Sequence, residues 1–219
     1  MTDSPNSKAA SLLLLGKGGS GKSTTAIALA SLSADMGWRT LILDADPQRS
    51  VSEWNALSTP SFAVHSIEVR AAPDVMERAK RRYDLVIIDH PPARYGGTQL
   101  LAQAADYSLI CARPFQFDVS LALEWVQFLK QVDAVPLVAL TAAPPMRLDG
   151  DAPSVQRARQ RLKDAQALLW HGQVTHRLAH PDLIGSGMTI MDLQKSNPAR
   201  AEYERLWFAI RQRIEASRG

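Results

Sequence analysis

The chain has one cysteine among its 219 residues, and only 6% of its residues are aromatic. The single thiol, Cys111, excludes disulfides and a cysteine-rich metal cage, and its apolar surroundings are typical of a core residue. Long apolar runs are also missing, and the sequence opens with the polar stretch Met1-Thr2-Asp3-Ser4-Pro5. We therefore expect a cytoplasmic protein with neither a signal peptide nor a membrane span.

The rest of the composition is that of a globular domain. Hydrophobic residues make up 46% of the chain and charged residues 21%. At this length and composition the chain can bury a stable core without disulfide bonds or metal ions. We expect a flexible N-terminus over residues 1–10 and a single domain over residues 11–219. Short β-rich runs alternate with helix-forming stretches, which predicts an α/β three-layer sandwich with a mostly parallel sheet and helices on both faces.

The expected elements can be placed by residue number. Strands are predicted near residues 11–15, 40–43, 62–65, 84–88, 107–111 and 135–140, with a weaker strand near 173–175. The predicted helices are Lys22 to Met36 with Gly37 as its C-cap, Asp74 to Arg82, a helix capped by Asp118 that reaches Val132, Ser154 to Leu168, and Ala199 to Ser217.

A glycine-rich loop follows the first predicted strand and opens the first predicted helix. Its sequence is Gly16-Lys17-Gly18-Gly19-Ser20-Gly21-Lys22-Ser23. Backbone N–H groups of such a loop surround phosphates, Lys22 neutralises charge on the β- and γ-phosphates, and the Ser23 hydroxyl binds Mg²⁺. The loop predicts binding of ATP with Mg²⁺. The residues expected around the nucleotide are Gly18, Gly19, Ser20, Gly21, Lys22, Ser23 and Thr24.

Four segments carry a family resemblance. Lys17 to Thr24, with its second lysine, resembles the deviant phosphate loop of the ParA/MinD family of partition and positioning ATPases. Thr40 to Gln48 resembles the first switch of that family, and Tyr83 to Pro92 its Walker B strand and second switch. Arg113 to Asp118 resembles a turn found in small plasmid partition ATPases. The resemblance is dense up to Asp118, is thinner beyond it, and implies a P-loop fold and hydrolysis of ATP to ADP and phosphate.

Three aspartates are expected at the carboxyl end of the sheet. Asp89 closes a strand beside the phosphate loop, where a carboxylate can hold Mg²⁺ through water; the alternative is a strand-end cap. By resemblance to the family, Asp46 orients or activates the attacking water and Asp44 supports the magnesium region. The alternative for both is a turn-forming role before Pro47.

Lys17 is not needed to hold phosphates within one chain. It is therefore either a solvated loop residue or a cation directed at the nucleotide of another molecule. In the family that the chain resembles, the corresponding lysine crosses a dimer interface to the partner's phosphates. The resemblance thus implies a homodimer formed with ATP, in which Lys17 acts in catalysis with Lys22 and Asp46. It also implies a ParB-like or adaptor protein that stimulates hydrolysis.

Positive charge gathers in the last third of the chain. Residues 1–140 contain 13 basic and 14 acidic residues, whereas residues 141–219 contain 12 and 8. Arg157 and Arg161 share one face of a predicted helix, where they can neutralise DNA phosphates without reading bases; the alternative is a solvated amphipathic helix. The family resemblance adds Arg177, Lys195 and Arg200. We expect nonspecific DNA binding and association with the nucleoid.

Two other functions stay open. The last predicted helix has a stripe of Tyr203, Trp207, Ile210 and Ile214 among arginines, as in a MinD-like protein that binds membranes, although we expect this stripe to pack inside the domain. A second alternative is an ATP-dependent enzyme of the dethiobiotin synthetase type. The cargo of a positioning ATPase, whether plasmid, chromosome or protein assembly, is left open by the residues.

Overall fold

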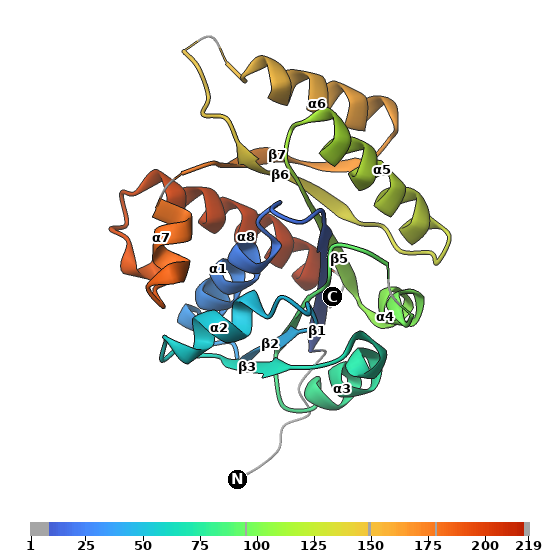
Figure 1. Ribbon diagram of the computed structural model, residues 1–219, viewed down its shortest axis with the longest axis vertical. Coiled ribbons are helices and arrows are strands. Elements are labelled where there is room, and N and C mark those ends of the chain that lie inside the picture. Colours follow the sequence, from blue (N-terminus) through green and yellow to red (C-terminus); the bar gives the residue numbers. More distant parts are fainter. Residues whose placement is uncertain (1–8, 95, 149, 178, 217–219) are drawn as a thin grey trace.

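A seven-stranded parallel sheet forms the centre of the protein, as the computed structural model shows for residues 9–94, 96–148, 150–177 and 179–216 (Figure 1). Its strand order is β3-β2-β4-β1-β5-β6-β7. The strands are β1 (Ala10–Gly16), β2 (Thr40–Asp44), β3 (Ala63–Ser66), β4 (Leu85–Asp89), β5 (Tyr107–Ala112), β6 (Leu137–Ala143) and β7 (Leu168–Thr175). The central strands are buried on both faces, so they read as continuous apolar runs.

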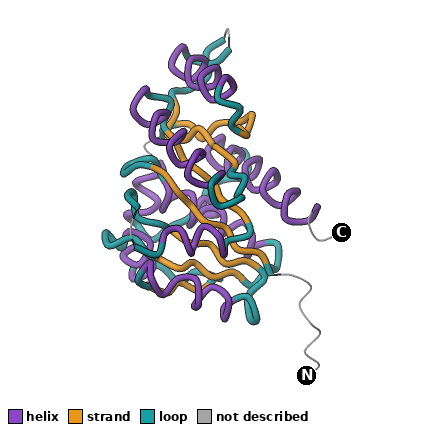
Figure 2. The backbone as a smooth tube through the Cα atoms, turned by 90° about the vertical axis from the view of Figure 1, so that its right-hand side faces the viewer, coloured by secondary structure: helices purple, strands orange, loops and turns teal. Residues whose placement is uncertain are grey.

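Helices cover both faces of this sheet, and Figure 2 shows the strands running between them. One face carries α1 (Lys22–Asp35), α2 (Ser50–Ala56), α7 (Ala179–Gly185) and α8 (Pro198–Ala216), whereas the other carries α3 (Ala72–Ala79), α4 (Thr98–Ala104), α5 (Gln116–Lys130) and α6 (Pro153–Asp164) (Figure 1). Two 3₁₀ turns, η1 (Val69–Ala71) and η2 (Ile190–Asp192), lie in the connections. The predicted three-layer sandwich is confirmed.

Two apolar cores lie on either side of the sheet. Along β1, Leu12 and Leu14 face the core beneath α1 and α8, whereas Leu13 and Leu15 face the core beneath α3, α4, α5 and α6. The apolar stripe of α8 belongs to the first core, because Tyr203, Trp207, Ile210 and Ile214 are each at most 3% exposed. These four side chains stabilise the domain and are not presented to a membrane.

The helix boundaries differ from the prediction around β7. The helix predicted over Ser154 to Leu168 ends at Asp164, and β7 already begins at Leu168. Gln166 takes the left-handed conformation (φ 52°), and the amide of Ala167 bonds back to the carbonyl of Leu162 at 3.0 Å. This arrangement closes a helix as a C-terminal glycine does, so the helix stops without a glycine to signal it.

Asp118 does not cap α5, so that prediction was wrong. The helix begins at Gln116 after Phe115, and no side chain caps its first turn. The carboxylate of Asp118 instead accepts hydrogen bonds from Arg113. Because the helix begins before Asp118, this residue lies inside its first turn and not at the cap position.

The C-terminal end of α1 and the start of the chain can also be compared with the prediction. Gly37 does close α1, with φ 83° and its amide bonded to the carbonyl of Ala34. The flexible N-terminus predicted for residues 1–10 was wrong at Ala10, which opens β1 and is buried. Residues 1–8 lie outside the described part of the chain.

Candidate nucleotide-binding site

The glycine-rich loop joins β1 to α1 at the carboxyl edge of the sheet. Gly16 ends β1, and a Cβ atom there would lie 2.2 Å from the carbonyl oxygen of Cys111 on β5, so only glycine fits. Gly21 precedes α1 with φ 83°, which also favours glycine. The predicted residues Gly18 to Thr24 therefore lie together, in the loop and in the first turn of α1.

Polar groups hold this loop from inside. The side chain of Lys22 is buried and its Nζ donates to the carbonyl of Lys17 at 3.4 Å, while the hydroxyl of Thr141 on β6 donates to the carbonyl of Ser20 at 2.7 Å. The hydroxyl of Ser20 is buried and has no hydrogen-bond partner among the described residues. A buried ammonium and an orphaned hydroxyl fit a loop that binds phosphate, because ligand oxygens would satisfy both.

Ser23 and Asp89 meet beside the loop. The Ser23 hydroxyl donates to Oδ2 of Asp89 at 2.6 Å, and Asp89 is fully buried at the end of β4. Burial raises the pKa of Asp89 to about 7, although the Ser23 hydrogen bond and the charge of Lys22 oppose the shift. Its Oδ1 has no partner among the described residues. This hydroxyl and carboxylate are the donor set that Mg²⁺ prefers, so the residues fit the predicted ion.

Asp44 ends β2, which pairs with β4, and Asp46 lies in the loop that follows. Asp44 is committed to local contacts: Oδ1 accepts from the Asp46 amide at 3.3 Å and Oδ2 from the Ser52 amide at 2.9 Å. Asp44 therefore anchors the start of α2, and its support of the magnesium region stays a prediction. Asp46 is 9% exposed, and its Oδ1 accepts from the Gln48 amide at 2.9 Å.

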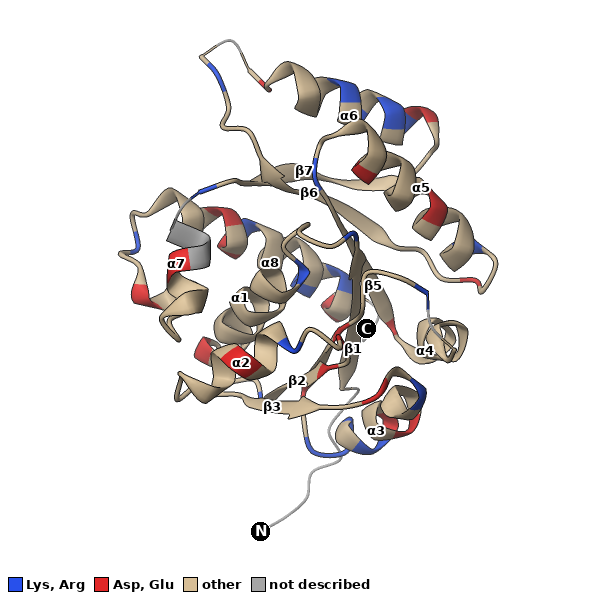
Figure 3. Ribbon diagram, viewed as in Figure 1, with Lys and Arg blue, Asp and Glu red and all other residues tan. Residues whose placement is uncertain are grey.

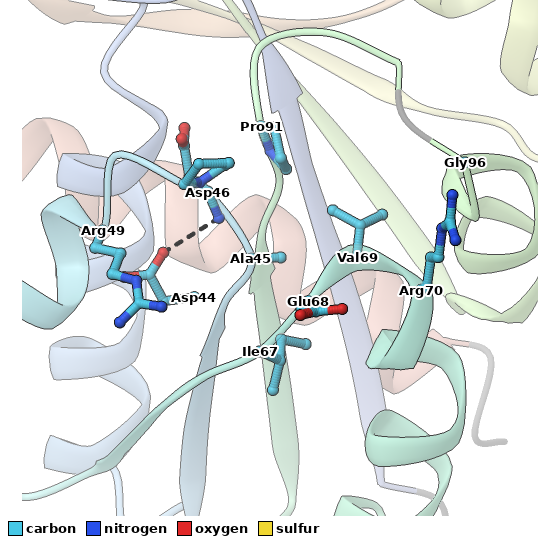
Figure 4. Close-up of a pocket in the computed structure, with 11 residues that line it drawn as sticks. Asp44, Ala45, Asp46, Arg49, Ile67, Glu68, Val69, Arg70, Pro91 and Gly96 are labelled. Atoms are coloured by element: carbon cyan, nitrogen blue, oxygen red, sulfur yellow. Dashed lines mark hydrogen bonds between the residues drawn. The ribbon is translucent and has the colours of Figure 1, made fainter.

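A cavity of about 330 Å³ lies beside these aspartates. Figure 4 shows Asp44 and Asp46 on one side of it, and Val69 and Arg70 of η1 on the other, with Pro91 of the second switch near Asp46. The two predicted switch segments thus border one cavity at the carboxyl edge of the sheet.

The second switch and Arg94, two residues beyond it, contact α5, and sequence reasoning missed the contact of Arg94. The guanidinium of Arg94 lies over Phe128 at 4.8 Å and over Trp125 at 5.5 Å from the ring centroids. His90 packs edge-on against Trp125, and burial lowers its pKa to about 4. Neutral His90 donates from Nδ1 to the carbonyl of Pro91 and accepts from the Thr98 hydroxyl at Nε2. His90 therefore has a structural role.

Lys17 lies at the outer edge of the loop. Its Nζ is 3.7 Å from Oδ2 of Asp118, and its side chain is 42% exposed, whereas that of Asp118 is 4% exposed. Arg113, at the end of β5, contacts the same carboxylate: Nε to Oδ1 at 2.7 Å and Nη2 to Oδ2 at 3.3 Å. The sequence pattern contained Arg113, but gave no sign that it would share a carboxylate with Lys17.

The basic residues predicted to bind DNA fall into two groups. Arg157, Arg161 and Lys195 are exposed, and Figure 3 shows several Lys and Arg positions along the ribbon of α6. Arg177 donates to Glu202 at 2.8 Å. Arg200 is buried and bonds Glu204 and the carbonyls of Met191 and Leu193, so it is a structural residue and its predicted DNA contact is not supported.

Together, a parallel α/β sheet, a glycine-rich loop before α1 and a buried Ser23–Asp89 pair define a P-loop protein that binds nucleoside triphosphate. Comparison with known proteins defines it further. Residues 12–215 match the CobQ/CobB/MinD/ParA nucleotide binding domain, and the chain belongs to this family of ATPases. The resemblance seen in the sequence is therefore confirmed.

Particular relatives agree with this assignment. The chain is 30% identical to the maintenance of carboxysome distribution protein A of Gloeobacter kilaueensis over 200 residues, which cover 89% of this chain and 90% of the relative. Two solved structures share its fold. The ATP complex of a McdA variant from Cyanothece has a TM-score of 0.76 at 16% identity, covering 93% of this chain and 97% of that one. The septum site-determining protein MinD of Pyrococcus horikoshii, complexed with Mg-ADP, has a TM-score of 0.75 at 13% identity, covering 96% and 98%.

The described residues contain no helix with both the length and the apolar character needed to cross a membrane.

Proposed function

We propose that this positioning ATPase forms a homodimer around two molecules of ATP with Mg²⁺, binds DNA without sequence preference, and leaves the DNA when a partner protein stimulates hydrolysis. The observation that carries the proposal is the position of Lys17. Lys22 fills the inner position of the phosphate loop, whereas the ammonium of Lys17 lies at its outer edge and is partly exposed.

An outer lysine has a clear use in a dimer. In a lone protomer its charge is screened by water, but an interface that excludes water would strengthen its attraction to the phosphates of a second molecule. Charge that develops on the transferred phosphate would be stabilised in the same way, as an arginine supplied in trans does in other ATPases. Dimer formation and hydrolysis then depend on one side chain, and Asp46 is the candidate that orients the attacking water.

The proposed DNA surface is formed by Arg157, Arg161 and Lys195, with Arg177 contributing if its contact to Glu202 opens. Arg157 and Arg161 lie one turn apart on α6. Such contacts to phosphates give sequence-independent, salt-sensitive binding, and two protomers would double the number of contacts. A protein held on the nucleoid in this way could position a cargo through a ParB-like or adaptor protein. The carboxysome-related relative favours a protein assembly as cargo.

The oligomeric state tests the central claim. With ATP and Mg²⁺ the protein should shift from monomer to dimer in light scattering coupled to gel filtration, and Lys17→Ala should stay monomeric while still binding ATP. A wild-type protein that is monomeric in ADP, ATP and a slowly hydrolysed analogue alike would refute the proposal.

Gel shifts with plasmid DNA test the second claim. Binding should need ATP, should weaken steeply between 50 and 200 mM salt, by roughly tenfold or more, and should be lost when Arg157→Glu and Arg161→Glu are combined. Arg81→Glu with Arg82→Glu makes the same charge change at exposed positions after α3 and is the matched control. Equal losses from both pairs would show that net charge, not this surface, governs binding. Flotation with anionic liposomes tests the membrane alternative, and the protein should not float.

A further inference from the structure

The cluster formed by Lys17, Arg113 and Asp118 has a feature that the proposed dimer does not explain. Among the described residues, two cations contact one buried carboxylate, and they do so unequally. Arg113 makes a two-point contact, 2.7 Å from Nε to Oδ1 and 3.3 Å from Nη2 to Oδ2. The single contact of Lys17 is longer, at 3.7 Å. Arg113 is thus the principal partner of Asp118, and Lys17 is the secondary one.

The difference between the strong contact of Arg113 and the weaker contact of Lys17 with Asp118 matters if Lys17 has to move. A buried carboxylate that loses its partner suffers a large desolvation penalty, so a lysine that alone neutralised Asp118 would be held there. With Arg113 in place, the carboxylate stays paired when Lys17 leaves. The lysine side chain is long and 42% exposed, so little else restrains it.

The fold holds Arg113 in a position where it can keep Asp118 paired. The residue directly follows β5, and its carbonyl accepts from the Phe115 amide at 2.8 Å in the turn that leads into α5. Its Nη1 lies 3.8 Å from the position that a Cβ atom of Gly19 would take, so the guanidinium also packs against the phosphate loop. Arg113 therefore spans the distance between Asp118 and the loop that carries Lys17.

We propose that Arg113 is a positioning residue: by neutralising Asp118 it frees Lys17 to reach the nucleotide of the second protomer. The inference rests on the proposed function, because it assumes that Lys17 acts across a dimer interface. It assigns Arg113 no contact with the phosphates, so ATP binding by one protomer should not depend on it.

The test uses the full chain and measures ATP-dependent dimer formation by light scattering, with a fluorescent ATP analogue to confirm that each variant binds nucleotide. Arg113→Gln should need at least about tenfold more protein to dimerise, since Lys17 then becomes the sole charged partner of Asp118 and one charge-assisted contact must break in each protomer. Arg113→Lys keeps the charge and should recover much of the loss. Combining Arg113→Gln with Asp118→Asn should restore the dimer, because the carboxylate that retains Lys17 is gone.

A purely structural role for Arg113 predicts the opposite for the combined variant, which would then be at least as defective as Arg113→Gln. That result, or normal dimer formation by Arg113→Gln, would overturn the inference. Asp118→Asn alone provides a second test, and should dimerise at the wild-type protein concentration or below it; a weaker dimer would also overturn it. If wild-type protein fails to dimerise with ATP, the proposed function is wrong, and the inference about Arg113 is wrong with it. If the wild-type protein dimerises and Lys17→Ala abolishes the dimer, the proposed function is supported. The Arg113 variants then test the role of Arg113 alone.

Discussion

The hydroxyl of Ser23 connects the phosphate loop to Asp89, and its contribution can be separated from that of the loop backbone. Ser23→Ala removes the 2.6 Å hydrogen bond and the proposed Mg²⁺ ligand together. We expect affinity for ATP to fall roughly tenfold when Mg²⁺ is present and to change little in EDTA. Titration with a fluorescent ATP analogue in both buffers measures this, with Ser23→Thr as the control that keeps the hydroxyl. Equal losses in both buffers would mean that Ser23 has no metal-dependent role.

Asp46 gives a prediction about turnover rather than affinity. If its carboxylate orients the attacking water, Asp46→Ala should lower hydrolysis by about 100-fold, the usual contribution of a general base, while the ATP-bound dimer persists. Phosphate release and light scattering on the same sample measure both properties. Asp35→Ala changes an exposed aspartate at the end of α1 and serves as the control. A variant that hydrolyses ATP at the wild-type rate would remove Asp46 from the mechanism.

Single residues also show where sequence reasoning stops. The positions of Lys22, Ser23 and Asp89 followed from a local pattern, since the loop and the strand end each contain their own signal. The contact of Arg94 did not follow, because its partner Trp125 lies far along the chain in α5 and becomes a neighbour only when the segment after β4 packs against that helix. Arg113 and Asp118 are only five residues apart, but their pairing depends on the shape of the turn between β5 and α5. An arginine that has a specific partner and one that only meets solvent look the same in a sequence.

At the scale of the element, β7 is the edge strand of the sheet and would expose backbone carbonyls there. Arg159 on α6 covers this edge: its guanidinium donates to the carbonyl of Gly172 at 3.1 Å and to that of Trp170 at 3.4 Å, and Asp151 holds it at 2.7 Å. One side chain thus satisfies two carbonyls of this edge strand, and we expect it to hinder further strand pairing there.

Arg159→Ala should therefore destabilise the fold by about 1–3 kcal/mol, because two carbonyls and the Asp151 carboxylate lose their partner. Urea denaturation followed by circular dichroism measures the change, and light scattering should detect more self-association through the uncovered edge. Arg157→Ala, two residues away on the exposed side of α6, should change the free energy of unfolding by no more than about 0.5 kcal/mol. Similar effects of the two substitutions would show that Arg159 does not protect β7.

The elements themselves were predictable to the extent that they carry local signals. Gly37 ends α1 because glycine accepts a left-handed conformation, and the sequence showed it. After α6, Gln166 takes the same left-handed conformation although it is not a glycine, so no residue in the sequence signals the helix end. The predicted helix therefore extended to Leu168, where β7 begins. The short helices α2, α4 and α7 have seven residues each, which is too few for the helical periodicity of apolar residues to be recognised. Tertiary packing decides where these helices begin and end.

At the scale of the whole molecule, parallel strand order places the site. Residues far apart in the sequence, such as Ser23, Asp46, Asp89 and Arg113, reach one edge because each follows or ends a parallel strand or opens the helix after it. That much of the site follows from the predicted fold alone. The closeness of β1 and β5, where Gly16 meets the carbonyl of Cys111, follows from the register of the sheet and not from any pattern in either strand.

Cys111 makes this junction measurable, since it is the only thiol in the chain and is fully buried beside the base of the phosphate loop. Burial raises its pKa to about 12, so at pH 8 the thiol stays protonated and unreactive unless the domain opens. Labelling with a disulfide reagent should therefore be slow in native protein and fast in urea. Because opening of β5 also removes the wall of the loop, ATP with Mg²⁺ at 100 times its Kd should slow labelling about 100-fold.

Two controls make the experiment decisive. In protein dilute enough to stay monomeric, ADP at the same multiple of its own Kd should protect equally, since the linkage then depends on occupancy and not on the γ-phosphate. ATP should give no protection to a Lys22→Ala variant that fails to bind it. Rapid labelling of native protein that ATP leaves unchanged would mean that β5 opens without disturbing the phosphate loop. The contact between Gly16 and Cys111 would then be local packing, and nucleotide binding would not be coupled to the stability of the central sheet.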